Sequence, residues 1–220
     1  MDWTRAIDGY CERTDPSYWS EPVNAVTNAA FLIAAFVMWR RVRGQGMPLA
    51  LLMVWVLAAI GVGSYLFHTH ATAWAMLADV VPIGIFILIY IYASNLHFWG
   101  MPVWAAALGT AAFVPYAMLL TPVFRGLPFF EVSAFYWPVP LLIGLTALAL
   151  ARRAPATARG LGLGAAILVL SLTFRSLDAA LCEAVPLGTH FLWHILNGIM
   201  LGWMIEVYRR HRLAERGGGR

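Results

Sequence analysis

The sequence predicts an all-α integral membrane protein with seven transmembrane helices, because of its composition, its apolar runs and its distribution of arginine. Of the 220 residues, 61% are hydrophobic and only 12% are charged, whereas a soluble domain carries about 25% charged residues. The arginines are gathered in a few short segments between apolar runs. We expect one domain, residues 1–220, because most of the chain is needed to cross the bilayer.

The apolar runs place the helices. A spanning helix needs about 20 mostly apolar residues. Runs of this kind follow one another at 22–39, 48–67, 74–94, 101–121, 134–151, 160–177 and 188–208. The run at 160–177 gives the weakest signal, since it is short and contains three glycines. Residues 1–21 form an acidic segment before the first run, and residues 209–220 form a basic tail.

Arginine decides the predicted orientation. Arginines concentrate in the link 40–47, in the link 152–159 and in the tail. These segments share one side of the membrane only if the number of spans is odd, and the positive-inside rule makes that side cytoplasmic. The N-terminus and most acidic residues then face outward. The net charge of +4 reflects this topology, so we expect no nucleic-acid partner.

Five polar residues stand in apolar surroundings near the predicted outer ends of three helices. They are Ser64, His68, Asp79, His190 and His194. Ionisable side chains inside a membrane are costly and mark functional sites. Ser64 and His68 are four residues apart, as are His190 and His194, which places each pair on one helix face. Three histidines with one open position are typical of catalytic zinc.

The remaining basic residues limit other interpretations. From spacing alone, zinc ligation by the three histidines and ordinary hydrogen bonding both stay open. We interpret His70, His97 and His211 as interfacial or hydrogen-bonded residues. The 15 basic residues are all arginine, so the chain has no lysine to hold retinal as a Schiff base. This excludes a retinal-binding pump.

The motifs GVGSYLFH (61–68) and GTHFLWH (188–194), with Asp79 between them, resemble the alkaline ceramidase family. That family belongs to a wider group of seven-helix membrane hydrolases that includes adiponectin-receptor-like proteins. The segment DGYCERTDPSYWSEPVNAVTN (8–28) shares the resemblance, which therefore covers nearly the whole chain. It implies a zinc-dependent hydrolase that cleaves the amide of ceramide, or of a similar N-acyl lipid, to a fatty acid and a sphingoid base.

The resemblance also implies roles for the residues. His68, His190 and His194 would hold zinc, and Ser64 and Asp79 would assist the water bound to it. We assign Asp79 as general base and then acid, because its carboxylate can pass a proton to the amide nitrogen. We assign Ser64 as a hydrogen-bond donor to the developing oxyanion.

A calcium site in the N-terminal segment is implied in the same way. Its ligands would be Asp8, Glu12, Glu21 and a backbone carbonyl near Tyr10, since oxygen ligands on a loop suit calcium. The match departs from the family pattern. One residue is inserted after Asp8, Thr14 stands where the family has asparagine, and the gap to Glu21 is two residues shorter. A solvated acidic segment without calcium therefore stays open.

Two further pairs are suggested by the predicted topology. Cys11 and Cys182 both fall on the outer side, where disulfides persist, and a bridge would tie the N-terminal segment to the link before the last helix. Two small buried thiols are the alternative. Arg175 and Asp178, three residues apart near the outer end of a helix, predict an ion pair.

Two other functions stay open besides the hydrolase. One is a seven-helix receptor or sensor resembling the adiponectin-receptor group, and the other is a metal or ion transporter. For the hydrolase, the partner is a lipid in the membrane. Its active site would lie near the outer face, whether periplasmic, luminal or extracellular.

Overall fold

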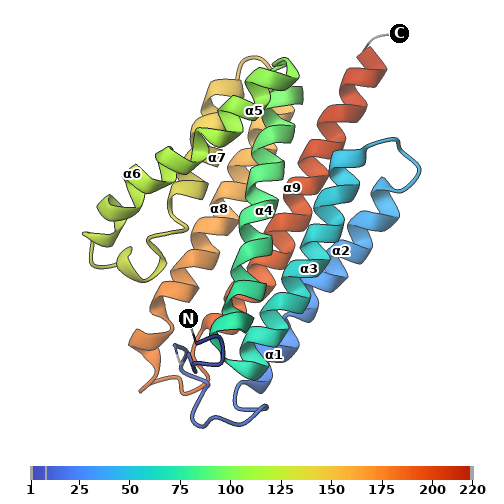
Figure 1. The fold of residues 1–220 in the computed structure, drawn as a ribbon. Coiled ribbons are helices and arrows are strands. Elements are labelled where there is room, and N and C mark those ends of the chain that lie inside the picture. Colours follow the sequence, from blue (N-terminus) through green and yellow to red (C-terminus); the bar gives the residue numbers. More distant parts are fainter. Residues whose placement is uncertain (1, 8, 219–220) are drawn as a thin grey trace.

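The computed structural model describes residues 2–7 and 9–218, which are helical apart from their links (Figure 1). The helices are α1 (Pro22–Thr27), α2 (Ala29–Val42), α3 (Pro48–His70), α4 (Ala73–His97), α5 (Val103–Ala111), α6 (Phe113–Arg125), α7 (Pro138–Leu150), α8 (Pro155–Leu177) and α9 (His190–Gly218). Two short 3-10 helices are η1 (Glu131–Ser133) and η2 (Ala179–Leu181). The described residues form no β-strand beyond one antiparallel bridge between Ala6 and Thr72. The all-α prediction is confirmed.

Six helical segments of the described chain are long and apolar enough to cross a membrane. They are Pro22–Val42, Pro48–His70, Ala73–His97, Val103–Arg125, Pro155–Leu177 and His190–Gly217. The chain is therefore a multi-pass membrane protein. The predicted span 134–151 differs, because its helix α7 has only 13 residues. At 1.5 Å per residue α7 is about 20 Å long, short of a hydrocarbon core of about 30 Å. The seventh span and the orientation of the termini stay predictions.

Two of the six segments are interrupted by local chemistry. Pro115 has no N–H to donate to the carbonyl of Ala111, and the helix breaks there into α5 and α6. Between α1 and α2, the Thr27 hydroxyl donates to the carbonyl of Val23 at 2.7 Å, and the Asn28 amide donates to the carbonyl of Asn24 at 2.8 Å. Such side-chain bonds compete with the helical ladder and favour a break.

Helix α9 forms the centre of the bundle, packing against α2, α3, α4 and α8. It is the most buried of the six segments, since 67% of the residues in its most apolar stretch lie inside the protein. Ile205 of α9 is fully buried, as are Phe31, Leu57 and Leu172 on the helices around it. Helix α6 contributes no buried residue and lies at the edge of the bundle (Figure 1). An apolar helix without buried residues is suited to lipid contact.

Helices α3 and α4 are antiparallel neighbours joined by two residues. Ala71 ends α3 in the left-handed conformation, with φ of 45°. Further along the pair, a Cβ added to Gly63 would overlap the carbonyl of Ala78, so the two backbones touch at this point. Ser64 directly follows Gly63 on α3, and Asp79 directly follows Ala78 on α4. This contact brings both of them to the α3–α4 interface.

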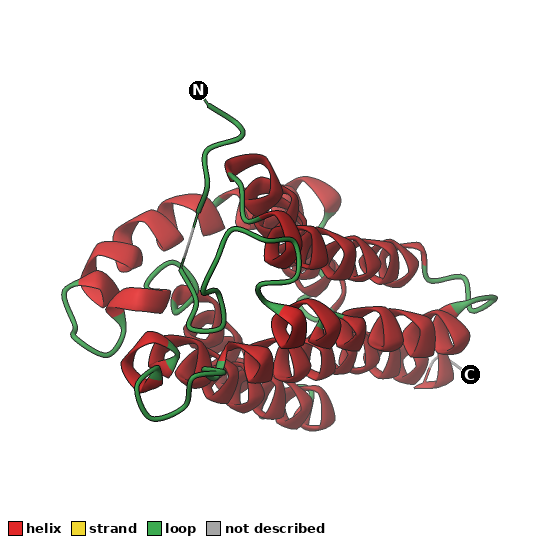
Figure 2. Ribbon diagram, turned by 90° about the horizontal axis from the view of Figure 1, so that it is seen from below, coloured by secondary structure: helices red, strands yellow, loops and turns green. Residues whose placement is uncertain are grey.

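The end of the bundle where α3 ends and α4 and α9 begin is called the site end below. The N-terminal segment crosses it as a loop (Figures 1 and 2). Backbone bonds fasten this loop to the α3–α4 link, from Ile7 N to Ala71 O at 2.7 Å and from Ala73 N to Arg5 O at 3.0 Å. The α2–α3 link, the α7–α8 link and the last turns of α9 lie at the opposite end (Figure 1). The arginine-rich segments therefore share one end of the molecule.

Candidate active site

Three histidines meet at the site end. His68 lies in the last turn of α3, and His190 and His194 lie in the first turns of α9. One ring nitrogen from each lies within 4.8 Å of the others, and in the described residues this is the group that could hold a metal ion. All three side chains are buried, with at most 1% of their surface exposed. The structure thus brings together the three residues predicted as zinc ligands.

The hydrogen bonds around His68 and His194 orient both rings. His68 Nδ1 lies 2.6 Å from the Glu21 carboxylate, which accepts the N–H of the ring. The Thr27 hydroxyl donates to the Val23 carbonyl, so its oxygen can accept the N–H of His194 Nδ1 at 3.0 Å. The Nε2 atoms of the two rings point toward each other and lie 3.0 Å apart. With both Nδ1 atoms engaged in this way, Nε2 is the nitrogen that each ring can offer to a metal ion.

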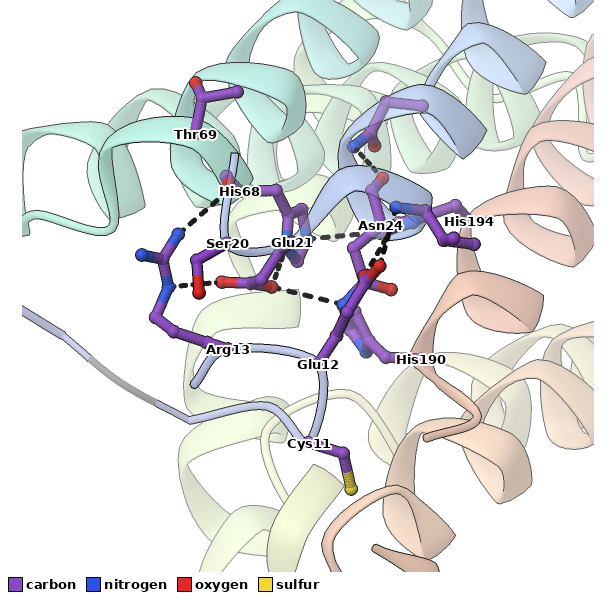
Figure 3. A network of polar contacts seen from close by, with 12 residues as sticks. Cys11, Glu12, Arg13, Ser20, Glu21, Asn24, His68, Thr69, His190 and His194 are labelled. Carbon is purple, nitrogen blue, oxygen red and sulfur yellow. Dashed lines mark hydrogen bonds and ion pairs between the residues drawn. The ribbon is translucent and has the colours of Figure 1, made fainter. Parts of the chain in front are cut away.

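This arrangement fits a metal ion. Metal-binding histidines usually donate the second ring nitrogen to a carboxylate, hydroxyl or carbonyl, which sets the tautomer and the ring orientation. Glu21 and Thr27 fill those positions for His68 and His194, and Figure 3 shows the contact of Glu21 with His68. Three histidine nitrogens match the donor set of a zinc site with one open coordination position.

His190 is oriented by aromatic stacking. Its ring stacks on Tyr10 with centroids 3.7 Å apart and on Trp193 with centroids 5.3 Å apart, at interplanar angles of 22° and 11°. Its buried Nδ1 has no hydrogen-bond partner in the protein. Trp193 Nε1 is also buried without a partner. This tryptophan therefore lies beside a candidate ligand with a free indole N–H.

Ser64 and Asp79 are both buried near the site end, on α3 and α4. Ser64 lies one turn before His68 on α3 and is fully buried, while Asp79 on α4 is 7% exposed. The Ser64 hydroxyl and Asp79 Oδ1 both lack a hydrogen-bond partner in the protein. Buried polar groups are normally paired, so unpaired ones are expected where a ligand binds.

Two cavities share part of their lining. One, at the site end, is lined by Tyr10, Asp79 and Arg175 among mostly apolar residues. The other runs into the bundle and is almost entirely apolar, with Phe31, Ile60 and Phe86 among its walls. Tyr136 and Trp193 line both cavities. A chamber that contains ionisable side chains and an apolar chamber thus share a wall that includes Trp193, on which the His190 ring stacks.

Asp178 connects three segments of the site end. Its carboxylate accepts backbone N–H groups from Cys11 at 3.0 Å, Thr189 at 2.6 Å and His190 at 2.8 Å. The predicted Arg175–Asp178 ion pair is wrong. The Arg175 guanidinium donates instead to the Val132 carbonyl and to the Ser133 hydroxyl. The first backbone N–H groups of α9 have no acceptor within the helix. A buried carboxylate next to them accepts these N–H groups, and both sides of the contact are then satisfied.

The cysteines lie together at the same end. Cys11 and Cys182 are joined as a disulfide with Cα atoms 5.4 Å apart, a normal separation for such a bond. The bond ties the N-terminal segment to the link between η2 and α9, close to the backbone bond from Cys11 N to Asp178. The N-terminal segment is thus fastened by a covalent bond and a hydrogen bond at adjacent points.

The residues predicted to bind calcium are engaged in other contacts. Asp8 lies outside the described residues. The Glu12 carboxylate accepts the N–H groups of Val23 and Asn24 in the first turn of α1, and burial raises the pKa of Glu12 despite these bonds. The Glu21 carboxylate contacts Arg13 and His68. The Tyr10 carbonyl accepts the backbone N–H of Arg13 at 3.2 Å. A calcium site here stays a prediction without support from the structure.

Sequence reasoning missed the shell of residues that holds the histidines. Burial alone would raise the pKa of Glu21, but its bonds and charge interactions with His68 and Arg13 outweigh burial and lower it. Arg13, Thr27 and Asp178 were likewise not identified as parts of the site. The clustering of polar residues in SEPVNAVTN at 20–28, where the first apolar run begins, was a signal for Glu21, Asn24 and Thr27.

Comparison with known proteins agrees with this geometry. No curated protein matches the chain. The family model described as ceramidase matches residues 6–219, which is almost the whole chain and includes all three histidines. The chain therefore belongs to the ceramidase family.

Proposed function

We propose that the protein is a zinc-dependent membrane amidohydrolase that cleaves the amide bond of ceramide or of a similar N-acyl lipid. One observation carries the proposal. Ring nitrogens of His68, His190 and His194 converge at the site end, with the Nε2 atoms of His68 and His194 3.0 Å apart, and a buried hydroxyl and a buried carboxylate lie without partners on the neighbouring turns. Family membership supplies the reaction class, hydrolysis of ceramide. It does not favour the receptor or transporter alternatives.

The three histidines would hold the zinc ion. When bound, zinc supplies a Lewis acid and lowers the pKa of a water molecule to about 7. Glu21 and Thr27 keep the ligand nitrogens of His68 and His194 unprotonated, because each binds the proton on the other ring nitrogen. Tyr10 and Trp193 hold the His190 ring between them.

Asp79 and Ser64 would carry out the proton transfer and the charge stabilisation. Asp79 takes a proton from the attacking water as the oxygen–carbon bond forms, and returns it to the nitrogen as the carbon–nitrogen bond breaks. The products are then a carboxylic acid and an amine. Ser64 donates a hydrogen bond to the oxygen of the former carbonyl, which gains negative charge during the attack.

The two cavities fit an amphipathic substrate. An amide and its hydroxylated headgroup match the chamber lined by Asp79 and Arg175, and a hydrocarbon chain matches the apolar chamber. Trp193 lies at their junction with an unpartnered indole N–H, so we assign it as a donor to the substrate.

Metal content and lipid hydrolysis test the proposal together. Purified wild-type protein should contain zinc and release fatty acid from ceramide, measured by elemental analysis and lipid mass spectrometry. His68→Ala, His190→Ala and His194→Ala should each lose zinc and activity. His70→Ala is the matched control, since His70 is exposed two residues from His68 on the same helix, and it should keep both. Wild-type protein without zinc and without fatty acid release would refute the proposal.

Ser64 and Asp79 are separated by a second comparison. Asp79→Asn should keep zinc and lose nearly all turnover, because an amide cannot transfer the proton. Ser64→Ala should keep zinc and lose on the order of 10²–10³ in kcat, the cost of one oxyanion donor. If Asp79→Asn loses its zinc and Ser64→Ala turns over at the wild-type rate, then Asp79 is a ligand and Ser64 only packs.

A further inference from the structure

The guanidinium of Arg13 is buried against the metal centre, although it lies on a loop. Its side chain is only 6% exposed, and that of Glu21 only 3%. Arg13 Nε donates to Glu21 Oε1 at 2.6 Å, and the other carboxylate oxygen lies 2.6 Å from His68 Nδ1. Figure 3 shows this sequence of contacts from Arg13 through Glu21 to His68. Arg13 is thus connected to the side chain of a candidate zinc ligand through Glu21.

The same guanidinium also reaches the backbone of that ligand. Arg13 Nη2 donates to the carbonyl oxygen of His68 at 3.0 Å, one of the last carbonyls of α3, which lack helical partners. Arg13 Nη1 donates to the carbonyls of Asp15 and Ser17 at 3.3 and 3.4 Å. One side chain therefore connects the N-terminal loop, the partner of the His68 ring and the His68 main chain.

A positive charge is required at this position on physical grounds. A carboxylate removed from water costs several kcal/mol unless it is paired and hydrogen-bonded. Glu21 receives further bonds from His68 and from the Asn24 amide at 3.1 Å, but Arg13 is the residue that pairs with it as a permanent cation. The planar fork of arginine suits several oxygens at once, which a lysine ammonium matches less well.

We propose that Arg13 is a positioning residue for the metal centre, holding Glu21 against His68 and closing the N-terminal segment over the site. This inference rests on the three-histidine zinc centre proposed above. It also gives Glu21 a partner within the chain, so the carboxylate does not need a divalent cation. The N-terminal segment is then fastened by an internal cation where the family resemblance suggested calcium.

Zinc affinity tests the inference more directly than turnover. The zinc dissociation constant is measured by competition with a chromogenic chelator for wild type, Arg13→Gln, Arg13→Lys, Glu21→Gln and the double variant Arg13→Gln/Glu21→Gln. Arg5→Gln is the matched control, because Arg5 is an exposed arginine of the same segment. Loss of a residue that supports a metal ligand typically weakens binding by about 10–100-fold. We expect that loss in Arg13→Gln, a smaller loss in Arg13→Lys and none in Arg5→Gln.

The double variant shows whether Arg13 acts through Glu21. If it does, the two substitutions are not additive, and the double variant binds zinc about as well as Glu21→Gln alone. This comparison holds even if Arg13→Gln does not fold, since the double variant leaves no unpaired buried carboxylate. Wild-type zinc affinity in Arg13→Gln, or a double variant much weaker than Glu21→Gln, would overturn the inference. Wild-type protein that binds no zinc would instead refute the proposed function.

Discussion

Asp178 offers a quantitative test of how the site end is held together. It is 2% exposed and accepts three backbone N–H groups, from Cys11, Thr189 and His190. In Asp178→Ala all three donors lose their partner. In Asp178→Asn one oxygen remains for Thr189 and His190, while the new NH₂ group faces the N–H of Cys11. We therefore expect the free energy of unfolding to be highest for wild type, lower for Asp178→Asn and lowest for Asp178→Ala.

The magnitude follows from the bonds. A hydrogen bond to a charged group contributes about 1.5 kcal/mol at the lower end of its range, so three give about 4.5 kcal/mol for Asp178→Ala. One lost bond and the lost charge give about 2 kcal/mol for Asp178→Asn. For a chain of 150–250 residues, 1 kcal/mol shifts Tm by about 2–4 °C. The expected decreases in Tm are then about 9–18 °C for Ala and about 4–8 °C for Asn.

Thermal unfolding of detergent-solubilised protein at fixed zinc concentration measures these shifts. Asp2→Ala is the control, because Asp2 is an exposed carboxylate of the same segment, and exposed substitutions change stability by about 0.5 kcal/mol or less. Equal Tm values for wild type, Asn and Ala would show that Asp178 does not connect these segments. An Asn variant less stable than the Ala variant would show that the bond geometry was misassigned.

Three other predictions concern the bridge, the loop and the topology. Non-reducing mass spectrometry should find the Cys11 and Cys182 peptides linked, and free thiols in protein purified without reductant would contradict this. Calcium added to calcium-free protein should leave Tm unchanged if Arg13 supplies the charge at Glu21, whereas a rise in Tm that Glu21→Ala abolishes would establish the calcium site. Reporter fusions should place residues 40–47 and the C-terminal tail on the same side of the membrane, and opposite sides would refute the odd number of spans.

Apolar runs and short spacings were sufficient to predict much of the fold and the three histidines. Six of the seven runs correspond to helices long enough to span a membrane, because hydropathy reports lipid contact directly. Within the run 134–151 the helix α7 begins only at Pro138, and hydropathy does not show where a helix begins. Pro138 and Pro140 could have shown it, since proline is tolerated in the first turn of a helix and not further along.

The residues that support the histidines could not be predicted from spacing. Glu21 and His68 are 47 residues apart, and Thr27 and His194 are 167 residues apart. Their contacts depend on how α1, α3 and α9 pack, which no local pattern records. The acidic N-terminal segment suggested oxygen ligands for a free cation. It did not suggest that Arg13, in the same segment, would itself be the cation that pairs with Glu21.

The backbone contact at Gly63 and Ala78 has a consequence for how the protein tolerates change. Ser64 and Asp79 follow that contact directly, so the distance between the two helices there is set by main-chain atoms that have no rotamers to exchange. Side chains on the lipid-facing surfaces of α5 and α6 are far less constrained, since α6 buries none of its residues. The periphery is therefore free to adapt to bilayers of different thickness and lipid content, while the spacing of the proposed catalytic pair stays constant.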